Sequence, residues 1–331
     1  MSKQFRHIIG ASLMALALSV GAASAQTYTA KIGKVGGDAD TPENLALLRY
    51  SQIVKQRTNG DVDLQIFLGG QLGDDAAVIE GMQLGSVEGG LNTVQALSSW
   101  VPQGDVWALP FMFDNGDELL KAVLGAPGDK LAEYYEAQGF HVAALWPAGA
   151  RNPVGHFPFA TLDEIKGKKI RVVQSQLAMQ IWNALGANPT PMPWPEVASA
   201  IETKAIDGFD TLGSAWQGMK LYESAPYYTH LDATWVVYAM VFSKQWWDSL
   251  PAEDQEILTK AAREMAVFQS NYLDYFNVRG PEVAAKAGGT VVEVTDKAPF
   301  RDAVADVWAN WAGSVDGGQE LIDLIQASNK G

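Results

Sequence analysis

Two arginines lie twenty residues apart near the middle of the chain, Arg151 in GARNPV and Arg171 in KKIRVV, and a proline-rich segment, PTPMPWPEV (Pro189–Val197), follows them. The whole chain is acidic, with a formal net charge of −14 at pH 7. A guanidinium group is a planar fork that pairs bidentately with a carboxylate. Arginines beside aromatic residues in an acidic chain therefore indicate a local pocket for a small anionic molecule.

Other reactive patterns are missing from the sequence. It contains no GxSxG elbow, P-loop or GxGxxG motif. Asp207 and Asp210 form a spaced acidic pair, but nothing near them supplies a nucleophile. No two of the histidines stand at metal-ligand spacing; they are His7, His141, His156 and His230. We expect no catalytic activity, no metal and no cofactor, and the acidic charge argues against binding to nucleic acid.

The N-terminus has the features of an export signal. Lys3 and Arg6 precede an apolar run, Ile8–Val20, and Ala23-Ser24-Ala25 fits a small-residue cleavage site. A membrane anchor is the alternative, but the apolar run is short for a membrane span. The chain has no cysteine, which excludes a lipidated cysteine after cleavage. Removal of residues 1–25 leaves 306 residues that begin at Gln26, changes the net charge to −16 and predicts a periplasmic protein.

Strand-like and helix-like segments alternate along the chain, which predicts an α/β architecture. The expected strands are 27–32, 62–68, 141–146, 169–173, 235–242 and 288–294, with a buried strand and turn at 106–113 and a short strand after 205–208. The expected helices are 43–57, 76–84, 176–185, 195–202, 251–277, 300–312 and 320–328. The mature length suffices for two domains.

Several phrases, in order along the chain, resemble the solute-binding proteins of TRAP transporters, the tripartite ATP-independent periplasmic carriers. GGQLGDDAAVIEGMQLGSVEGG (Gly69–Gly90) is similar to the family's QLGDD helix and the turn after it. ALPFMF (Ala108–Phe113) and TLDEIKGKKIRV (Thr161–Val172) resemble two further family segments. ALGANPTPMPWPEVASAIETKAIDG (Ala184–Gly208) resembles the segment that ends in the family's DG motif.

The resemblance implies a two-domain clamshell of the periplasmic-binding-protein type, with strands that cross between the domains and the solute held between them. The implied division gives residues 26–148 and 237–276 to domain I, and residues 149–236 and 277–331 to domain II. A long helix spans both lobes in this family, and Pro251–Asn277 is the segment that fits it.

The resemblance also implies binding residues. Arg171 occupies the position of the family's arginine that pairs with the solute carboxylate, and Arg151 occupies that of a second arginine. Trp194 falls where an aromatic side chain stacks on the solute. The family's DGQEN reads DGFDT here, so Thr211 replaces an asparagine and offers one hydroxyl group for an amide. Asp210 in the same motif is either a solute contact or a cap near the hinge.

Further candidates come from the first domain and from tryptophans. Asp38 and Asp75 either face the cleft or cap helices. Thr93 stands where sialic-acid binders of this family carry a charged residue, as does Ala96, so a sialic acid is not expected. Trp235 is a candidate for an aromatic wall, with core packing as the alternative.

The function implied is that of an extracytoplasmic receptor, a monomer that binds a small organic carboxylate and delivers it to the TRAP membrane subunits. A binding protein of an ATP-driven importer shares export, acidity and a clamshell, and a secreted hydrolase is a third possibility that a turnover assay would test. The sequence does not distinguish among sugar acids, hydroxy acids, keto acids and aromatic acids.

Overall fold

Ten strands form one mixed sheet in the computed structural model, which describes residues 27–36 and 41–330. The strand order is β2-β1-β3-β9-β4-β7-β5-β6, and β8 joins β4 to β10. The strands are β1 (Tyr28–Gly33), β2 (Val62–Phe67), β3 (Gly89–Thr93), β4 (Phe140–Gly155), β5 (Lys169–Val172), β6 (Asn188–Pro191), β7 (Gly208–Thr211), β8 (Tyr227–His230), β9 (Thr234–Ser243) and β10 (Thr290–Glu293). The predicted signal segment, 1–25, lies outside the described residues.

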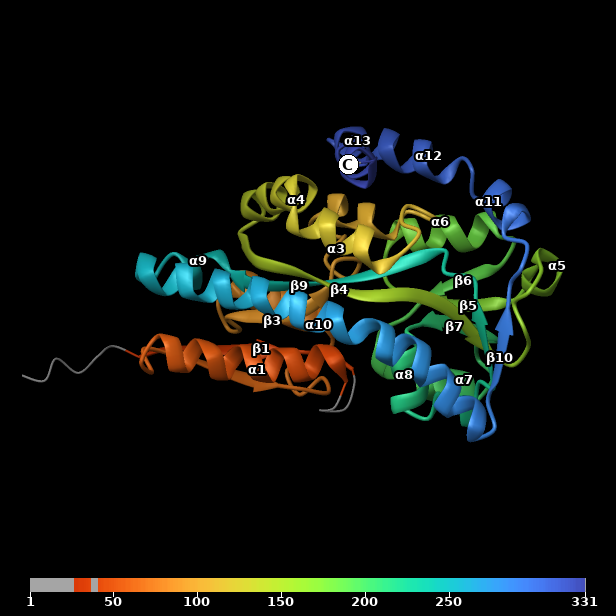
Figure 1. Ribbon diagram of the computed structural model, residues 1–331, viewed down its shortest axis with the longest axis horizontal. Coiled ribbons are helices and arrows are strands. Elements are labelled where there is room, and N and C mark those ends of the chain that lie inside the picture. Colours follow the sequence, from red (N-terminus) through yellow and green to blue (C-terminus); the bar gives the residue numbers. More distant parts are fainter. Residues whose placement is uncertain (1–26, 37–40, 331) are drawn as a thin grey trace, which may run out of the picture.

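Helices cover the sheet on both faces (Figure 1). They are α1 (Pro42–Arg57), α2 (Asp75–Leu84), α3 (Gly116–Leu124), α4 (Ala126–Ala137), α5 (Leu162–Ile165), α6 (Gln176–Ala184), α7 (Val197–Glu202), α8 (Gly213–Gly218), α9 (Lys244–Trp247), α10 (Ala252–Lys286), α11 (Ala298–Ala303), α12 (Val307–Ser314) and α13 (Gly318–Lys330), with 3-10 helices η1 (Pro102–Ala108), η2 (Trp194–Glu196) and η3 (Leu221–Glu223). Within the described ranges, no helix combines the length and the apolar character needed to cross a membrane.

Two strands connect the halves of the molecule. β4 pairs with β9 from Phe140 to Arg151, and its last residues, Asn152–Gly155, pair with β7 and β8 instead. We call the half that contains β1, β2 and β3 the first lobe, and the half that contains β5, β6, β7 and β8 the second lobe. The predicted two-domain α/β architecture with crossing strands is confirmed (Figure 1).

The predicted domain boundaries stay a prediction. α13 belongs to the segment that the prediction gives to domain II, but it contacts α3, α4 and η1, which lie within the segment given to domain I. The C-terminal helix α13 therefore lies along the outside of the first lobe, and α12, which precedes it, contacts both α13 and α6 of the second lobe (Figure 1).

The long helix α10 connects both lobes on one face. It begins after Pro251 as predicted, but it ends at Lys286 and not at Asn277. It contacts α1 and α3 in the first lobe and α8 in the second. Pro281 lies inside the helix and packs against Gly213 of α8, where an added Cβ would be 2.8 Å from the proline ring. Tertiary packing thus carries the helix through a proline that would otherwise end it.

Two other predictions were wrong in part. The expected strand and turn at 106–113 begins in a 3-10 helix, η1, and Val106, Trp107 and Ala108 are fully buried. A short run buried on all sides has no periodicity that separates helix from strand. The expected helix at 300–312 is divided between α11 and α12.

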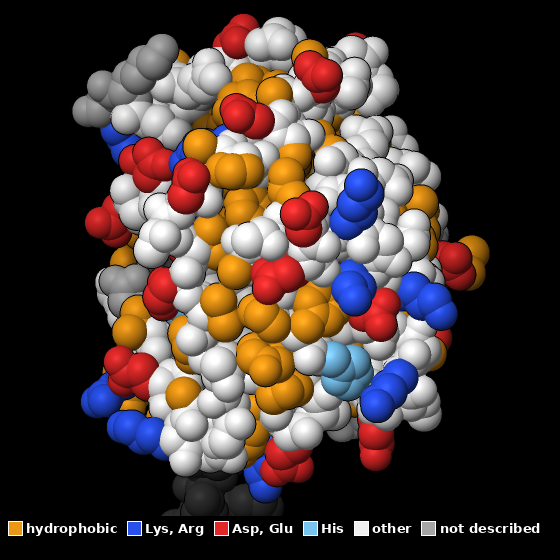
Figure 2. Space-filling model, turned by 90° about the vertical axis from the view of Figure 1, so that its right-hand side faces the viewer, with side chains coloured by type: hydrophobic (Ala, Val, Ile, Leu, Met, Phe, Trp, Pro, Cys, Tyr) orange, Lys and Arg blue, Asp and Glu red, His pale blue; other side chains and the backbone are white. Residues whose placement is uncertain are grey.

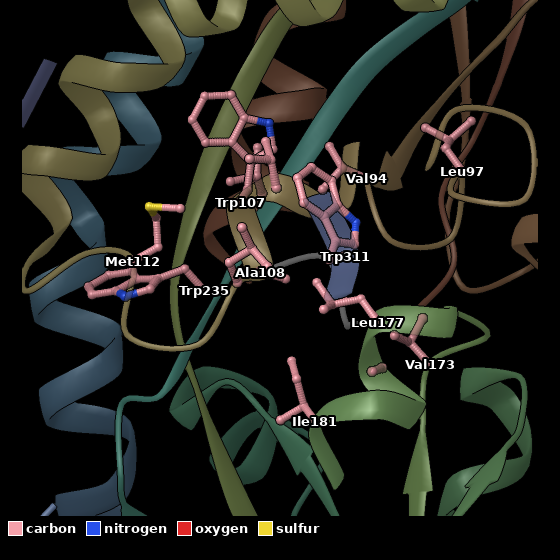
Figure 3. Packing of buried hydrophobic residues seen from close by; sticks show 14 of the residues in the cluster. Val94, Leu97, Trp107, Ala108, Met112, Val173, Leu177, Ile181, Trp235 and Trp311 are labelled. Atoms are coloured by element: carbon pink, nitrogen blue, oxygen red, sulfur yellow. The ribbon is translucent and has the colours of Figure 1, made fainter. Parts of the chain in front are cut away.

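A continuous hydrophobic core joins the lobes on the side of η1. Trp107 and Ala108 of η1, Leu177 and Ile181 of α6 and Trp311 of α12 belong to the same buried cluster. Figure 3 shows these side chains together, with Leu177 and Ile181 extending from the second lobe toward η1. This packing connects α6 of the second lobe with η1 and α12.

The outer face of the second lobe carries charges of both signs. Figure 2 shows acidic and basic side chains interspersed around a band of hydrophobic side chains on this face. The lysines and arginines visible there stand near acidic groups, so that face shows no broad basic surface.

Candidate functional site

The carboxyl ends of parallel strands from both lobes point toward one crevice. In the first lobe, β1 pairs in parallel with β2 and β3. In the second lobe, β5 pairs in parallel with β6 and β7. Ligands of open α/β sheets bind outside the carboxyl ends of their strands, because loops and helix N-termini collect there. The topology therefore places the candidate site between the two sets of strand ends.

A cavity of about 80 Å³ lies at this place. This volume is well below the ~300 Å³ at which pockets for drug-sized ligands begin. Seven of the nine predicted binding residues line it; they are Asp75, Thr93, Arg151, Arg171, Trp194, Asp210 and Thr211. We call this space the interlobe cavity.

Arg171 on β5 is a buried cation of the cavity. Its side chain is buried, with 4% of the residue exposed, and its Nε donates to the carbonyl oxygen of Met192 at 2.9 Å. Burial, and then the charge of Arg151, lower the pKa of Arg171 to about 10, so it stays protonated at neutral pH. Among the described residues, no carboxylate forms an ion pair with it.

Arg151 on β4 has an anionic partner. Its Nη1 lies 3.4 Å from Oδ1 of Asp210 on β7, and both side chains are about nine-tenths buried. The other oxygen of Asp210 accepts a hydrogen bond from Nε1 of Trp182 at 3.1 Å. Two arginines twenty residues apart are thus brought into one cavity, but only Arg171 is left without a charged partner.

Trp194 forms an aromatic wall beside Arg171. The guanidinium carbon of Arg171 lies 5.5 Å from the centroid of its ring, a distance at which a cation is attracted to an aromatic face. The ring also reaches the first lobe at Gly36, where an added Cβ would be 2.8 Å from it. Gly36 has a φ of +75°, which also favours glycine. The two lobes therefore touch at this edge of the cavity.

Asp75 and Thr93 enter the cavity from the first lobe. Asp74 caps α2 by accepting from the backbone N–H of Ala77 at 2.9 Å, which leaves Asp75 for other contacts. Asp75 accepts a hydrogen bond from Nδ2 of Asn92 at 2.7 Å. Burial raises its pKa, while that bond and the charges of Lys34 and Arg171 lower it. Asp74, and not Asp75, is therefore the cap of α2, and Asp75 lies in the cavity wall.

The sequence analysis missed four polar residues of this wall, Lys34, Thr41, Glu43 and Tyr238. Lys34 directly follows β1, and Glu43 is in the first turn of α1, so the rule about strand ends could have found both. Tyr238 lies within the apolar run of β9 and gives no signal in the sequence that separates it from a core residue.

Two predicted binding residues are not brought to the cavity. Trp235 packs in the hydrophobic core, and its Nε1 donates to the carbonyl oxygen of Phe113 at 3.1 Å. Figure 3 shows it beside Met112. Core packing, the alternative reading, is what the structure shows for Trp235. Asp38 lies outside the described residues.

The described residues contain no group of three or more histidine, aspartate or glutamate side chains arranged to hold a metal ion. The polar groups of the cavity are guanidinium, ammonium, carboxylate and hydroxyl groups. Together they can bind a small molecule by charge and hydrogen bonds.

Comparisons with known proteins agree with this geometry. Residues 32–314 match the family described as bacterial extracellular solute-binding protein, family 7. The C4-dicarboxylate-binding periplasmic protein DctP of Rhodobacter capsulatus is 29% identical over 328 residues, which cover 97% of this chain and 96% of that protein. The 2,3-diketo-L-gulonate-binding periplasmic protein YiaO of Escherichia coli is 26% identical over 266 residues, covering 80% and 81%.

Solved structures of TRAP periplasmic solute-binding proteins have the same fold. One from Desulfovibrio salexigens with bound orotic acid superposes with a TM-score of 0.88 at 27% identity, covering 92% of this chain and 99% of that one. Another, from Roseobacter denitrificans with bound β-D-glucuronate, has a TM-score of 0.86 at 27% identity, covering 90% and 99%. The resemblance seen in the sequence is confirmed, and the chain belongs to family 7 of the bacterial extracellular solute-binding proteins.

Proposed function

We propose that this chain is an exported receptor that binds a small organic carboxylate in the interlobe cavity and delivers it to the membrane subunits of a TRAP transporter. The observation that carries the proposal is the unpaired guanidinium of Arg171 at the end of β5. A buried cation without an anionic partner is costly, and a solute carboxylate would compensate it.

Other features of the cavity support the same role. Nε of Arg171 is held by the carbonyl group of Met192, so the remaining N–H groups of the fork are preorganised for a carboxylate. Trp194 supplies a flat surface for the carbon skeleton of the solute. Thr211, which is 6% exposed, supplies a hydroxyl group. Arg151 and Asp210 then act as a neutral pair that borders the solute.

The proposal includes opening and closing of the lobes. The interlobe cavity has walls from both lobes, so the closed form alone makes all contacts with the solute. A ligand that binds one form better shifts the protein toward that form. The closed form is then the form that the membrane subunits would recognise, and delivery would depend on occupancy.

A thermal-shift screen of organic acids against purified mature protein tests the proposal. Ligands that bind the folded state raise the melting temperature with concentration. We expect carboxylates to raise the melting temperature of the protein. We also expect mass spectrometry after incubation to recover the ligand unchanged, which would show that the protein does not turn it over. Stabilisation by neutral sugars or peptides, with none by any carboxylate, would contradict the proposal, and conversion of the ligand would favour the hydrolase alternative.

A further inference from the structure

A second pocket, of about 280 Å³, lies where η1 and the segment before it face the start of α6, the end of β6 and α12. No described residue lines both this pocket and the interlobe cavity. Figure 3 shows Leu177 of α6 below Trp311 of α12, and both residues line the pocket. We call it the Asp105 pocket, because Asp105 is the one ionisable side chain among the described residues of its lining.

The carboxyl group of Asp105 uses only part of its capacity for hydrogen bonds. The residue is 3% exposed, and its Oδ2 accepts from Ser175 Oγ at 2.8 Å. Its Oδ1 is buried and has no hydrogen-bond partner among the described residues. No lysine or arginine belongs to the described lining. A buried carboxylate is costly without a positive partner, so this pocket favours a cation.

Two more polar atoms of the lining are buried without a hydrogen-bond partner among the described residues. They are Oε1 of Gln180 on α6 and Nε1 of Trp311 on α12, and Trp311 is 2% exposed. Buried polar atoms are seldom left unpaired in native proteins, because each one costs free energy. Together with Asp105, they place two acceptors and one donor, from three different elements, around one pocket. This set indicates a ligand that supplies both kinds of hydrogen bond.

The lining also has an apolar part. Leu177, Met179 and Val315 contribute aliphatic groups, and the polar residues other than Asp105 are neutral serines and glutamines. A short carbon chain can pack against the aliphatic groups. A ligand of this pocket therefore needs a positive charge, a hydrogen-bond acceptor and a short apolar chain.

We propose that the Asp105 pocket is a second ligand site, which binds a small aliphatic ammonium ion that carries a hydroxyl group. Its N–H groups donate to Oδ1 of Asp105 and Oε1 of Gln180, and its hydroxyl oxygen accepts from Nε1 of Trp311. The inference goes beyond the proposed function and does not depend on it, because the two sites have separate linings.

A hydroxyalkyl ammonium ion fits the pocket better than the alternatives. A carboxylate would face Asp105 with no cation of the lining to pair with it. A metal ion would pair with Asp105, but it offers Trp311 no acceptor and leaves the aliphatic groups uncovered. A neutral alcohol can form the hydrogen bonds, but it leaves the carboxylate without a positive partner.

Titration calorimetry on the mature protein at pH 8 and constant chloride concentration tests the inference. The three probes have the same number of non-hydrogen atoms: 3-amino-1-propanol, n-butylamine and 1,3-propanediol. We expect 1,3-propanediol to bind at least about thirtyfold more weakly than 3-amino-1-propanol, because it lacks the charge that pairs with Asp105. We expect n-butylamine to bind about fivefold more weakly, because it leaves the N–H of Trp311 unpaired.

Variants locate the binding in this pocket. Asp105→Asn keeps the shape and removes the charge, so the preference for 3-amino-1-propanol over 1,3-propanediol should fall by at least about tenfold. Asp316→Asn is the matched control, since Asp316 is exposed, follows Val315 in the sequence and lies outside the lining. The control should keep the preference. The indole N–H resonance that is lost in Trp311→Phe should shift when 3-amino-1-propanol binds to wild type.

The dependence of binding on pH gives an independent measurement. Burial raises the pKa of Asp105 to about 7, so a proton competes with the ligand below that pH. An aliphatic ammonium group stays protonated in this range, so affinity should fall by up to about tenfold for each pH unit below 7.

Other charged groups near Asp105 are few. η1 packs against α4, α6, α13 and β9, and the described residues of α6 include no titratable side chain. The charge of Arg151 on β4 also acts on Asp105. The groups on the other three elements are the buried Tyr135 of α4, Tyr238 of β9 and the exposed Glu320 and Asp323 of α13.

Each outcome supports or overturns the inference. It is overturned if 3-amino-1-propanol does not bind, if 1,3-propanediol binds as tightly, or if sodium chloride shifts the Trp311 resonance in the same way. Equal binding to wild type and Asp105→Asn would place the cation elsewhere and overturn it too. Equal affinity for n-butylamine would overturn the role of Trp311. The wild-type probe series decides the charge preference even where a variant fails to fold, and the screen of carboxylates tests the proposed function separately.

Discussion

The interlobe cavity and the pocket around Asp105 both bury carboxyl groups between the lobes, but they differ in how the charge is balanced. Among the described residues of the cavity, three carboxyl groups lie with Lys34, Arg151 and Arg171. Asp105 of η1 is 3% exposed, and its Oδ2 accepts a hydrogen bond from Ser175 Oγ at 2.8 Å. Its Oδ1 has no partner among the described residues.

The difference appears in the protonation of the two regions. Burial raises the pKa of Asp105 to about 7, and the interactions with Ser175, the backbone N–H of Leu177 and Ser98, together with the charge of Arg151, offset this only in part. The neighbouring Tyr135 hydroxyl, itself raised in pKa by burial and by Asp105, offers no positive charge. At Asp105 the hydrogen bonds and the charge of Arg151 do not offset the cost of burying the ionised carboxyl group. In the cavity, carboxyl groups lie beside cations. Among the described residues, no cation forms an ion pair with Asp105.

The largest effect that would test this comparison comes from Arg171→Lys. The charge is kept, but an ammonium group cannot make the two parallel bonds of a guanidinium. We expect a loss of roughly 2–4 kcal/mol in solute binding, or about thirty- to a thousandfold in Kd. Arg151→Lys should cost less, because Arg151 is already paired with Asp210.

Titration calorimetry on both variants checks this ranking. Arg263→Lys is the control, since Arg263 forms an exposed ion pair with Asp129 far from the cavity lining. Equal small losses for Arg171→Lys and Arg151→Lys would show that Arg171 is not the anchor.

A smaller loss is expected from Trp194→Ala. The indole ring contributes apolar area and orientation next to Arg171, and its removal should cost about 1–3 kcal/mol of solute affinity. The change in tryptophan fluorescence on binding should shrink in the variant. Trp235→Phe, in the core and outside the cavity lining, should leave the Kd unchanged. Unaltered affinity and fluorescence change in Trp194→Ala would remove Trp194 from the site.

The Asp105 pocket predicts a dependence of stability on pH. A carboxyl group with a folded-state pKa of about 7, above the value near 4 expected unfolded, binds its proton more tightly in the folded state. Its contribution to stability is fully present below pH 4 and is lost as the pH rises toward 7. We expect about 1–3 kcal/mol of this loss between pH 5 and pH 7.

Asp105→Asn isolates this effect, because it keeps the acceptor for Ser175 and cannot titrate. Urea unfolding at a series of pH values should show a smaller decline in the free energy of unfolding for Asp105→Asn than for wild type. Parallel curves for the two proteins would mean that the pKa of Asp105 is not raised in the folded state.

The smallest expected effect tests the contact between the lobes at the edge of the cavity. Gly36→Ala places a Cβ 2.8 Å from the Trp194 ring at a φ of +75°, so it should hinder closure. Small-angle scattering of wild type should show a smaller radius of gyration with saturating solute, and the contraction should be reduced in Gly36→Ala. Part of that reduction should be relieved in Gly36→Ala/Trp194→Ala, since the clash needs both residues. Identical wild-type curves with and without solute would favour a rigid pocket.

The sequence was informative where local pattern and final structure agree. Caps and apolar spacing predicted α1 and α2, and the run at 235–242 became β9 almost as predicted. The family motifs identified seven residues that line the cavity. These residues lie at strand ends and at the starts of α2 and η2, and the family resemblance was enough to predict that they share a site.

The rest depended on packing that the sequence does not display. Val106 and Trp107 belong to a fully buried apolar run. The hydrophobic pattern of such a run has no periodicity that separates a helix from a strand. α10 continues past Asn277 because Pro281 fits against Gly213, a contact between segments far apart in the chain. Tyr238 lies within the apolar run of β9, so nothing in the sequence marked it as part of the cavity wall.

The crossing strands also have a consequence for how the chain is made. β3 pairs along its length with β9, and the partner of Gly89 is Phe242. Synthesis proceeds from the N-terminus, so β9 becomes available to β3 only after residues 94–237 have been added. At ordinary rates of translation this takes on the order of ten seconds or more. During that interval the first three strands present an unpaired edge to other chains. This connectivity therefore favours folding that begins only after β9 is available.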